Sequence, residues 1–124
     1  MTLLPKNILI LAAALLLGAP PASAQQVQVQ VLEHDTVEGR YNSLVQVDAD
    51  TYALAYQGAD SDGFLKTFTI SADGMTITQV QVLEHDTNRG QANSLVQVDA
   101  DTYALAFRGV GADGFLKTFP ISAD

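Results

Sequence analysis

Hydrophobic and polar residues alternate in short runs along most of the chain beyond its first 24 residues. A two-residue period predicts β-strands that turn one face to a core. Between residues 43 and 85 it predicts four strands, at residues 43–48, 51–57, 64–71 and 76–85. No stretch beyond the first 24 residues has the 3.6-residue period of a helix, so we expect an all-β fold.

Two of the predicted connections carry turn signals. Asp48-Ala49-Asp50 precedes the second strand, and Asp side chains favour turns because they bond to nearby backbone N–H groups. Asp73-Gly74 follows the third strand, where Gly supplies the positive φ that a tight hairpin needs. On the second strand Ala53 and Ala55 share one thin face, which suits close stacking of a neighbouring sheet.

The pattern occurs twice. Residues 28–73 recur at residues 79–124 with an offset of 51, and 36 of the 46 aligned positions are identical. A period near 50 that contains four short strands is typical of one β-propeller blade. We therefore expect a β-propeller-like repeat domain at residues 25–124, with two four-stranded antiparallel blades. Its ring is incomplete in one chain, because propellers have about 4–8 blades.

Residues 25–34 repeat the pattern of the fourth strand and are predicted to be a strand without a neighbour. We expect it to pair with the predicted strand at residues 115–122, within the chain or between chains, because unpaired edges promote such pairing. Three or four copies would close six or eight blades, which predicts a homo-trimer or homo-tetramer. The alternatives are a piece of a longer propeller and another two-repeat β fold.

Two resemblances support the expected architecture. The segment SADGMTI at residues 71–77 resembles the Asp-box turn of sialidase-type propellers. It departs from that pattern because one residue is missing between Asp73 and Gly74, and Ile77 replaces an aromatic residue. In that family the turn is structural, so the resemblance implies a fold and no chemistry. The arrangement also resembles small two-blade lectins that assemble into one propeller, without their sugar-binding motifs.

Residues 1–24 have the organisation of a secretory signal peptide: Lys6, an apolar run at residues 8–17, then Gly18, Pro20-Pro21 and Ala-Ser-Ala. The alternative is a membrane anchor. Ten apolar residues in a helix would span about 15 Å, roughly half of a bilayer's hydrocarbon core. The pattern thus favours a secreted or periplasmic protein that has no membrane segment after processing.

The charge of the chain and its lack of cysteine narrow the classes of ligand and chemistry that it could support. Fourteen acidic and six basic residues give a net charge of −8, which disfavours nucleic acid and anionic lipid as partners. There is no cysteine, so the chain has no disulfide and no thiolate nucleophile. No motif predicts a cofactor.

The differences between the two copies suggest where a ligand would bind. Nine of the ten lie in the connection before the first strand of a repeat or around the loop after its second strand. In an up-and-down meander these connections share one end, and binding residues concentrate on such loops. Sequence drift in exposed loops would give the same pattern. The candidate ligand-binding residues are Arg40, Tyr41, Tyr56, Gln57, Asp60, Arg89, Phe107 and Arg108.

Catalytic and metal sites are not predicted. The three arginines invite comparison with the arginine triad of sialidase-type enzymes, whose Tyr–Glu pair and acid/base Asp have no counterpart here. His34 and His85 each stand in Glu-His-Asp, which would suit a metal or acid–base chemistry only if chains combined. The favoured interpretation is an Asp that shapes the turn, with a hydrogen-bonded His beside it.

Asp60-Ser61-Asp62-Gly63 resembles the beginning of a calcium loop, but its counterpart in the second repeat, Gly111-Ala112-Asp113-Gly114, has one carboxylate fewer.

The sequence therefore predicts a secreted, non-catalytic module that binds a glycan or a protein through its loop face. A rim of exposed Tyr41, Tyr56 and Phe107 would favour this function. The alternatives are a subunit or piece of a propeller hydrolase, which convergent carboxylates with a His would favour, and a purely structural repeat array.

Overall fold

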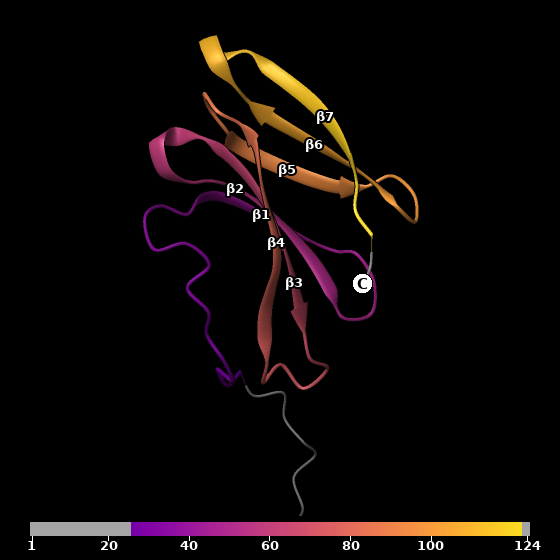
Figure 1. Cartoon of the computed structure of the whole chain (residues 1–124). Coiled ribbons are helices and arrows are strands. Elements are labelled where there is room, and N and C mark those ends of the chain that lie inside the picture. The colour runs from indigo at the N-terminus through magenta and orange to yellow at the C-terminus, as the bar shows by residue number, and fades with distance from the viewer. Residues whose placement is uncertain (1–25, 123–124) are drawn as a thin grey trace, which may run out of the picture.

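The computed structural model describes residues 26–122, so the predicted signal peptide lies outside the described residues. The chain forms two antiparallel sheets (Figure 1). The first sheet has the order β1-β2-β3-β4, and the second has the order β5-β6-β7. The strands are β1 (Arg40–Gln46), β2 (Thr51–Gln57), β3 (Gly63–Ile70), β4 (Ile77–Asp86), β5 (Gln91–Gln97), β6 (Thr102–Arg108) and β7 (Gly114–Pro120). The predicted all-β fold is confirmed.

Local side-chain chemistry accounts for the turns. The Asp48 carboxylate accepts the N–H groups of Asp50 and Thr51 at 3.1 and 2.8 Å, which closes the turn between β1 and β2. Gly74 has a φ of 75° in the turn between β3 and β4. The loops after β2 and β6 each contain a short 3₁₀ turn, at Ala59–Ser61 and Val110–Ala112. Within the described residues no helix is long and apolar enough to cross a membrane.

The strand predicted at residues 25–34 is not formed in its described part, residues 26–34. The second sheet accordingly has three strands among the described residues, so the expected pairing of this strand within the same chain is not formed, and the pairing between chains stays a prediction. The physical reason is the position of the segment. It runs along the first sheet, far from β7, the edge strand it was expected to join (Figure 1). A lone strand has no backbone partner to stabilise it.

The main core lies between the two sheets. The thin face of β2, with Ala53 and Ala55 fully buried, packs with Tyr103, Leu105 and Phe107 of β6. The expected close stacking on small side chains is therefore present. The other face of the first sheet carries a smaller cluster of Leu54, Tyr56 and Phe68.

Hydrogen bonds join the two sheets along β1 and β5. The Leu95 N–H donates to Ser43 Oγ at 3.0 Å, and Asn93 Nδ2 donates to the Tyr41 carbonyl at 3.1 Å. The Tyr103 hydroxyl donates to the Val47 carbonyl at 3.3 Å. The repeats thus meet through a specific interface of small, aromatic and polar groups.

Candidate functional site

The divergent connections of the two repeats meet at one end of the molecule, as expected for a meander. The Gly90 N–H, before β5, donates to the Ser61 carbonyl, after β2, at 2.9 Å. A side chain at Gly90 would overlap Gly63, so the two backbones pack directly on each other. We call this surface the loop end: residues 35–41, 58–62, 86–92 and 109–113.

Tyr41 has the most unusual backbone of the candidate residues. It adopts a φ of 54° where the pairing of β1 with β2 shifts register between Arg40 and Ser43. A bulky residue in the left-handed region is uncommon, and bulges of this kind redirect side chains near functional sites. The Tyr41 side chain is exposed, and its carbonyl is held by Asn93. In the second repeat Ala92 has the same conformation, with a φ of 51°.

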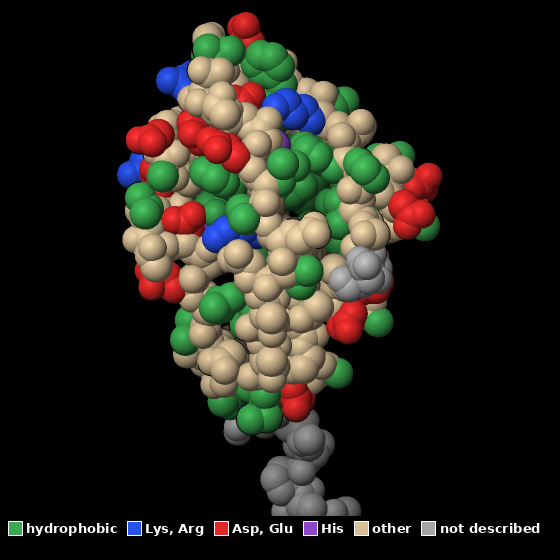
Figure 2. Space-filling view, viewed as in Figure 1, with side chains coloured by type: hydrophobic (Ala, Val, Ile, Leu, Met, Phe, Trp, Pro, Cys, Tyr) green, Lys and Arg blue, Asp and Glu red, His purple; other side chains and the backbone are tan. Residues whose placement is uncertain are grey.

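The arginines lie at the loop end with differing exposure. Arg40 is exposed, and its Nε contacts the Glu38 carboxylate at 3.0 Å. Arg108 is exposed and Arg89 is half-buried, and within the described residues neither forms an ion pair. Asp60 is also exposed. Basic side chains are few on the face that Figure 2 shows, where acidic ones are frequent.

Three candidates lie beneath this surface. Tyr56, Gln57 and Phe107 are buried, so the expected aromatic rim of Tyr41, Tyr56 and Phe107 does not form. The Tyr56 hydroxyl donates to Asp35 Oδ2 at 2.8 Å, and burial together with this bond raises the pKa of Tyr56.

Gln57 also has a supporting position. Its Nε2 donates to Glu38 Oε1 at 3.0 Å, the same oxygen that contacts Arg40. The buried residues therefore position the connections above them rather than offering their side chains to a ligand.

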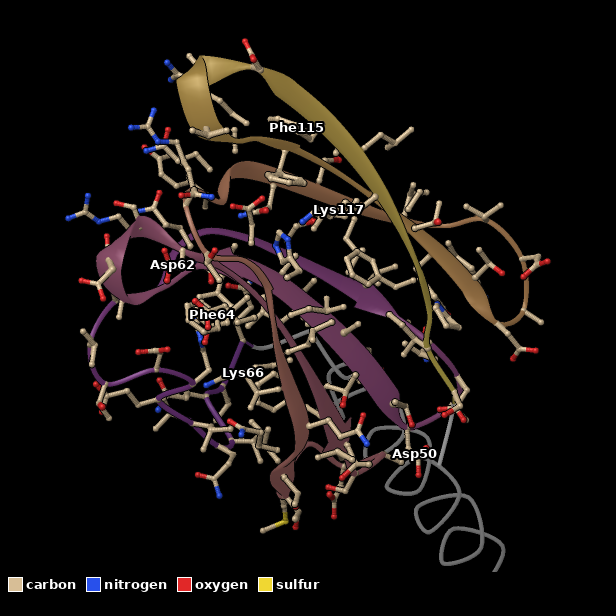
Figure 3. The ribbon with its side chains drawn as sticks, turned by 45° about the horizontal axis from the view of Figure 1, so that its top comes forward. Asp50, Asp62, Phe64, Lys66, Phe115 and Lys117 are labelled. Carbon is tan, nitrogen blue, oxygen red and sulfur yellow. The ribbon has the colours of Figure 1, made fainter. Side chains whose placement is uncertain are left out.

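The two repeats share one arrangement of a lysine, a histidine carbonyl and an aromatic ring, which supports the connection before the first strand of each repeat. In the first repeat Lys66 Nζ donates to the His34 carbonyl and lies 5.5 Å from the centre of the Tyr56 ring. In the second, Lys117 Nζ donates to the His85 carbonyl and lies 5.2 Å from the Phe107 ring. Figure 3 shows Lys66 and Lys117 on their two sheets.

Sequence analysis missed these lysines. The signal was a cationic residue inside an otherwise apolar strand, repeated without change in FLKTF.

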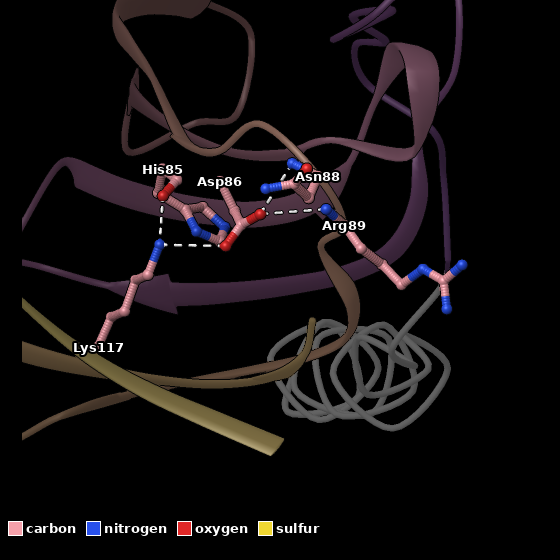
Figure 4. A network of polar contacts seen from close by, with 5 residues as sticks. All are labelled: His85, Asp86, Asn88, Arg89 and Lys117. Atoms are coloured by element: carbon pink, nitrogen blue, oxygen red, sulfur yellow. Dashed lines mark hydrogen bonds and ion pairs between the residues drawn. The ribbon is translucent and has the colours of Figure 1, made fainter. Parts of the chain in front are cut away.

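Asp86 closes the connection in the second repeat (Figure 4). Its Oδ1 accepts the N–H groups of Asn88 and Arg89 at 2.9 and 3.1 Å, and its Oδ2 lies 3.4 Å from Lys117 Nζ. Burial raises the pKa of Asp86, but these hydrogen bonds and the Lys117 charge outweigh it, so the pKa lies below its ordinary value. The predicted role of the Asp in shaping the turn is confirmed.

The predicted hydrogen bond to the neighbouring His ring is wrong for His85. Neither ring nitrogen of His85 has a partner among the described residues, and the ring lies edge-on to Phe107 and Phe119. Burial, helped by the Lys117 charge, lowers the pKa of His85 to about 4. The imidazole is therefore neutral at pH 7 and packs as an aromatic group.

The calcium-like segment, Asp60–Gly63, begins within the short 3₁₀ turn Ala59–Ser61, where Asp60 has a φ of 59°, and ends at the first residue of β3. Nearby, a hydrogen bond shared with Asp62, burial and repulsion from the Asp62 and Asp60 charges raise the pKa of Glu84. In the part of the chain that the structure describes, no group of three or more His, Asp or Glu residues is arranged to hold a metal ion.

One cavity of about 160 Å³ lies away from the loop end, between β3, β4 and the end of β7. Leu65, Val82, Phe119 and Ile121 are among its lining residues. Pockets for small organic ligands usually have volumes of about 300–1,000 Å³. This cavity is smaller than such pockets, and none of the candidate ligand-binding residues lines it.

Comparison with family models, curated proteins and solved structures finds no match for this chain. A functional assignment must therefore come from the residues and their geometry.

Proposed function

We propose that this chain is an exported, non-catalytic β-propeller-type repeat module that binds a glycan or protein partner through its loop end. The observation that carries the proposal is Tyr41. It is an exposed aromatic residue, held in a strained conformation at a bulge and fixed by Asn93. Backbone strain of this kind costs about 1–3 kcal/mol and is concentrated at functional sites.

The positions of the arginines, rather than the net charge of the loop end, support a carboxylate-bearing glycan as the ligand. The loop end also carries the carboxylates of Asp35, Glu38, Asp60, Asp62, Asp86 and Asp113. The chain has a net charge of −8, yet its arginines, Arg40, Arg89 and Arg108, all lie at or beside the loop end. A guanidinium binds a carboxylate through two parallel hydrogen bonds, and a tyrosine ring offers an apolar face with a polar edge to a sugar. Tyr41 and Arg40 are adjacent and exposed, so they form the centre of the proposed surface.

The test compares binding of a uronic-acid oligosaccharide with binding of its neutral analogue by calorimetry. Tyr41→Ala and Arg40→Gln are well-matched variants, because the second repeat already has Ala92 and Gln91 at these positions. We expect each to weaken binding of the acidic oligosaccharide about tenfold, which corresponds to about 1.4 kcal/mol.

Met75→Ala, at an exposed position outside the loop end, is the control and should bind like the wild type. Unchanged affinity in both loop-end variants, or no binding by the wild type, would contradict the proposal.

The second candidate is a purely structural array. The burial of Tyr56, Gln57 and Phe107 favours it, because these residues serve packing. It predicts that the loop-end variants alter no binding at all. A propeller hydrolase has weaker support, since His85 has no polar partner for its ring among the described residues.

A further inference from the structure

We propose that copies of this chain assemble head to tail. Residues 26–33 of one copy add a fourth strand beside β7 of the next, and the outer face of the first copy's first sheet packs against the outer face of the next copy's second sheet. This inference does not depend on the proposed glycan binding.

The unpaired edges of the two repeats match each other. In the first repeat β3 pairs with β4, whereas its counterpart β7 has only β6 as a neighbour among the described residues. The counterpart of β4 is the segment 26–35, at the same offset of 51 residues, and most of this segment is exposed and unpaired. Among the described residues the second sheet thus lacks the fourth strand that the first sheet has, and the segment that corresponds to this strand forms no strand pair.

The anchor points show which sheet the segment would join. β4 belongs to the first sheet, but its His85 carbonyl is held by Lys117 of the second sheet. The His34 carbonyl is held in the same way by Lys66 of the first sheet. In the second repeat the strand that contains His85 thus belongs to the sheet before the one that carries the lysine. By analogy, residues 26–33, which lead to His34, would belong to a sheet that precedes the first one. The described part of a single chain has no such sheet, and a neighbour's β5-β6-β7 sheet has the required free edge.

The exposed faces repeat the interface that already joins the two sheets. Leu65 is 6% exposed beneath the second sheet, whereas its counterpart Leu116 is 73% exposed. On the opposing side Leu95 is 7% exposed, whereas its counterpart Leu44 is 59% exposed. The exposed parts of the two outer faces, around Leu44 and Leu116, therefore correspond to the two halves of the interface that joins the sheets within one chain. Leu54, Tyr56 and Phe68 on the outer face of the first sheet are already buried within the chain. Such a head-to-tail contact closes into a ring if the rotation permits.

Polar and backbone contacts follow the same rule. Asn93 Nδ2 donates to the Gly90 carbonyl of its own repeat and, across the interface, to the Tyr41 carbonyl. Its counterpart Asn42 donates to the Gly39 carbonyl, and among the described residues it has no bond across an interface. Gly63 packs on Gly90, while a side chain at its counterpart Gly114 would meet nothing within 4 Å. In the assembly Gly39 of a neighbour would lie at Gly114.

A disulfide trap tests the strand register. Leu83 pairs with Leu65 between β4 and β3, so the assembly places Leu32 of one copy opposite Leu116 of the next. Directly opposed residues on paired strands have Cα atoms about 4.5–5.5 Å apart, within disulfide reach. The chain has no cysteine of its own. Under mild oxidation the double variant Leu32→Cys/Leu116→Cys should give a ladder of covalent oligomers whose largest member reports the number of copies in the ring.

The control for the trap is Leu32→Cys/Val110→Cys, because Val110 is exposed at the loop end. It should remain mostly single chains. Absence of a ladder in the first variant, or a bond within one chain, would overturn the proposed pairing.

Light scattering measures the mass of the assembly and so tests whether the outer face of the second sheet, which carries Leu116, is an interface. The wild type should have several times the mass of one chain, and Leu116→Lys should reduce it to a single chain while the β-sheet circular dichroism persists. Val37→Lys places the same charge at an equally exposed site outside the interface and should keep the wild-type mass. A single-chain mass for the wild type, or an unchanged mass for Leu116→Lys, refutes the assembly. A different protein would then be the partner for these faces.

Discussion

The imidazole of His85 lies edge-on to the ring of Phe107, with the ring centres 5.0 Å apart. The first repeat has the same relationship between His34 and Tyr56, at 4.7 Å. In each case a lysine holds the carbonyl of the same histidine. The connection into each repeat is thus fastened to its sheet by packing and one charge-assisted hydrogen bond.

This packing predicts a loss of stability in acid. The unfolded chain protonates His85 at its ordinary pKa of 6.5, whereas the folded chain does so only near a pKa of about 4. Between these values the unfolded state binds more protons, so the free energy of unfolding falls as the pH is lowered from about 6.5 to about 4. Urea titrations of the wild type and His85→Leu across this range should show a smaller pH dependence in the variant. Parallel curves would mean that His85 is solvated.

Leu105 is the most informative core position because it is fully buried between the sheets. Leu105→Ala should lower the free energy of unfolding by about 2–5 kcal/mol, since it removes buried methyl groups and leaves a cavity. Chemical denaturation measures this value. Val37→Ala, at an exposed site, should change it by less than about 0.5 kcal/mol. A similar small change in Leu105→Ala would place that side chain outside the core.

Asp86 should contribute to stability through its turn. Asp86→Ala removes the acceptor for two backbone N–H groups and a contact with Lys117. We expect a loss of about 1.5–3 kcal/mol, the usual range for hydrogen bonds to a charged group. Asp101→Ala, at an exposed site, is the control for removing one carboxylate. Equal thermal midpoints for the two variants would contradict a role for the turn.

Tyr56→Phe tests the hydrogen bond that only the first repeat has. The variant removes the 2.8 Å bond to Asp35 and makes the position resemble Phe107. Asp35 keeps its bonds from the Val37 and Glu38 N–H groups, so the loss should be only about 1 kcal/mol. The raised pKa of Tyr56 should also disappear from a spectrophotometric titration of the tyrosines. If the variant gave the same titration curve as the wild type, the tyrosine with the raised pKa would not be Tyr56.

The local structure was predictable from sequence because it depends on neighbours along the chain. Alternation identified the strands from residue 43 to residue 85, and Asp48 and Gly74 marked two of the turns. The repeat identified the second sheet in the same way. The small face of β2 also followed directly from the positions of Ala53 and Ala55.

Only the tertiary structure decided which of two equivalent positions in the repeats is buried by the neighbouring sheet. Leu65 and Leu116 stand in the same local sequence, as do Leu44 and Leu95, yet one of each pair is buried and the other exposed. Similarly, Tyr56 and Phe107 belong to divergent positions but lie beneath the loop end. Alternation states which side chains share a face of a strand. Whether that face is buried depends on a second sheet, and within residues 26–122 each repeat has a neighbouring sheet on only one side.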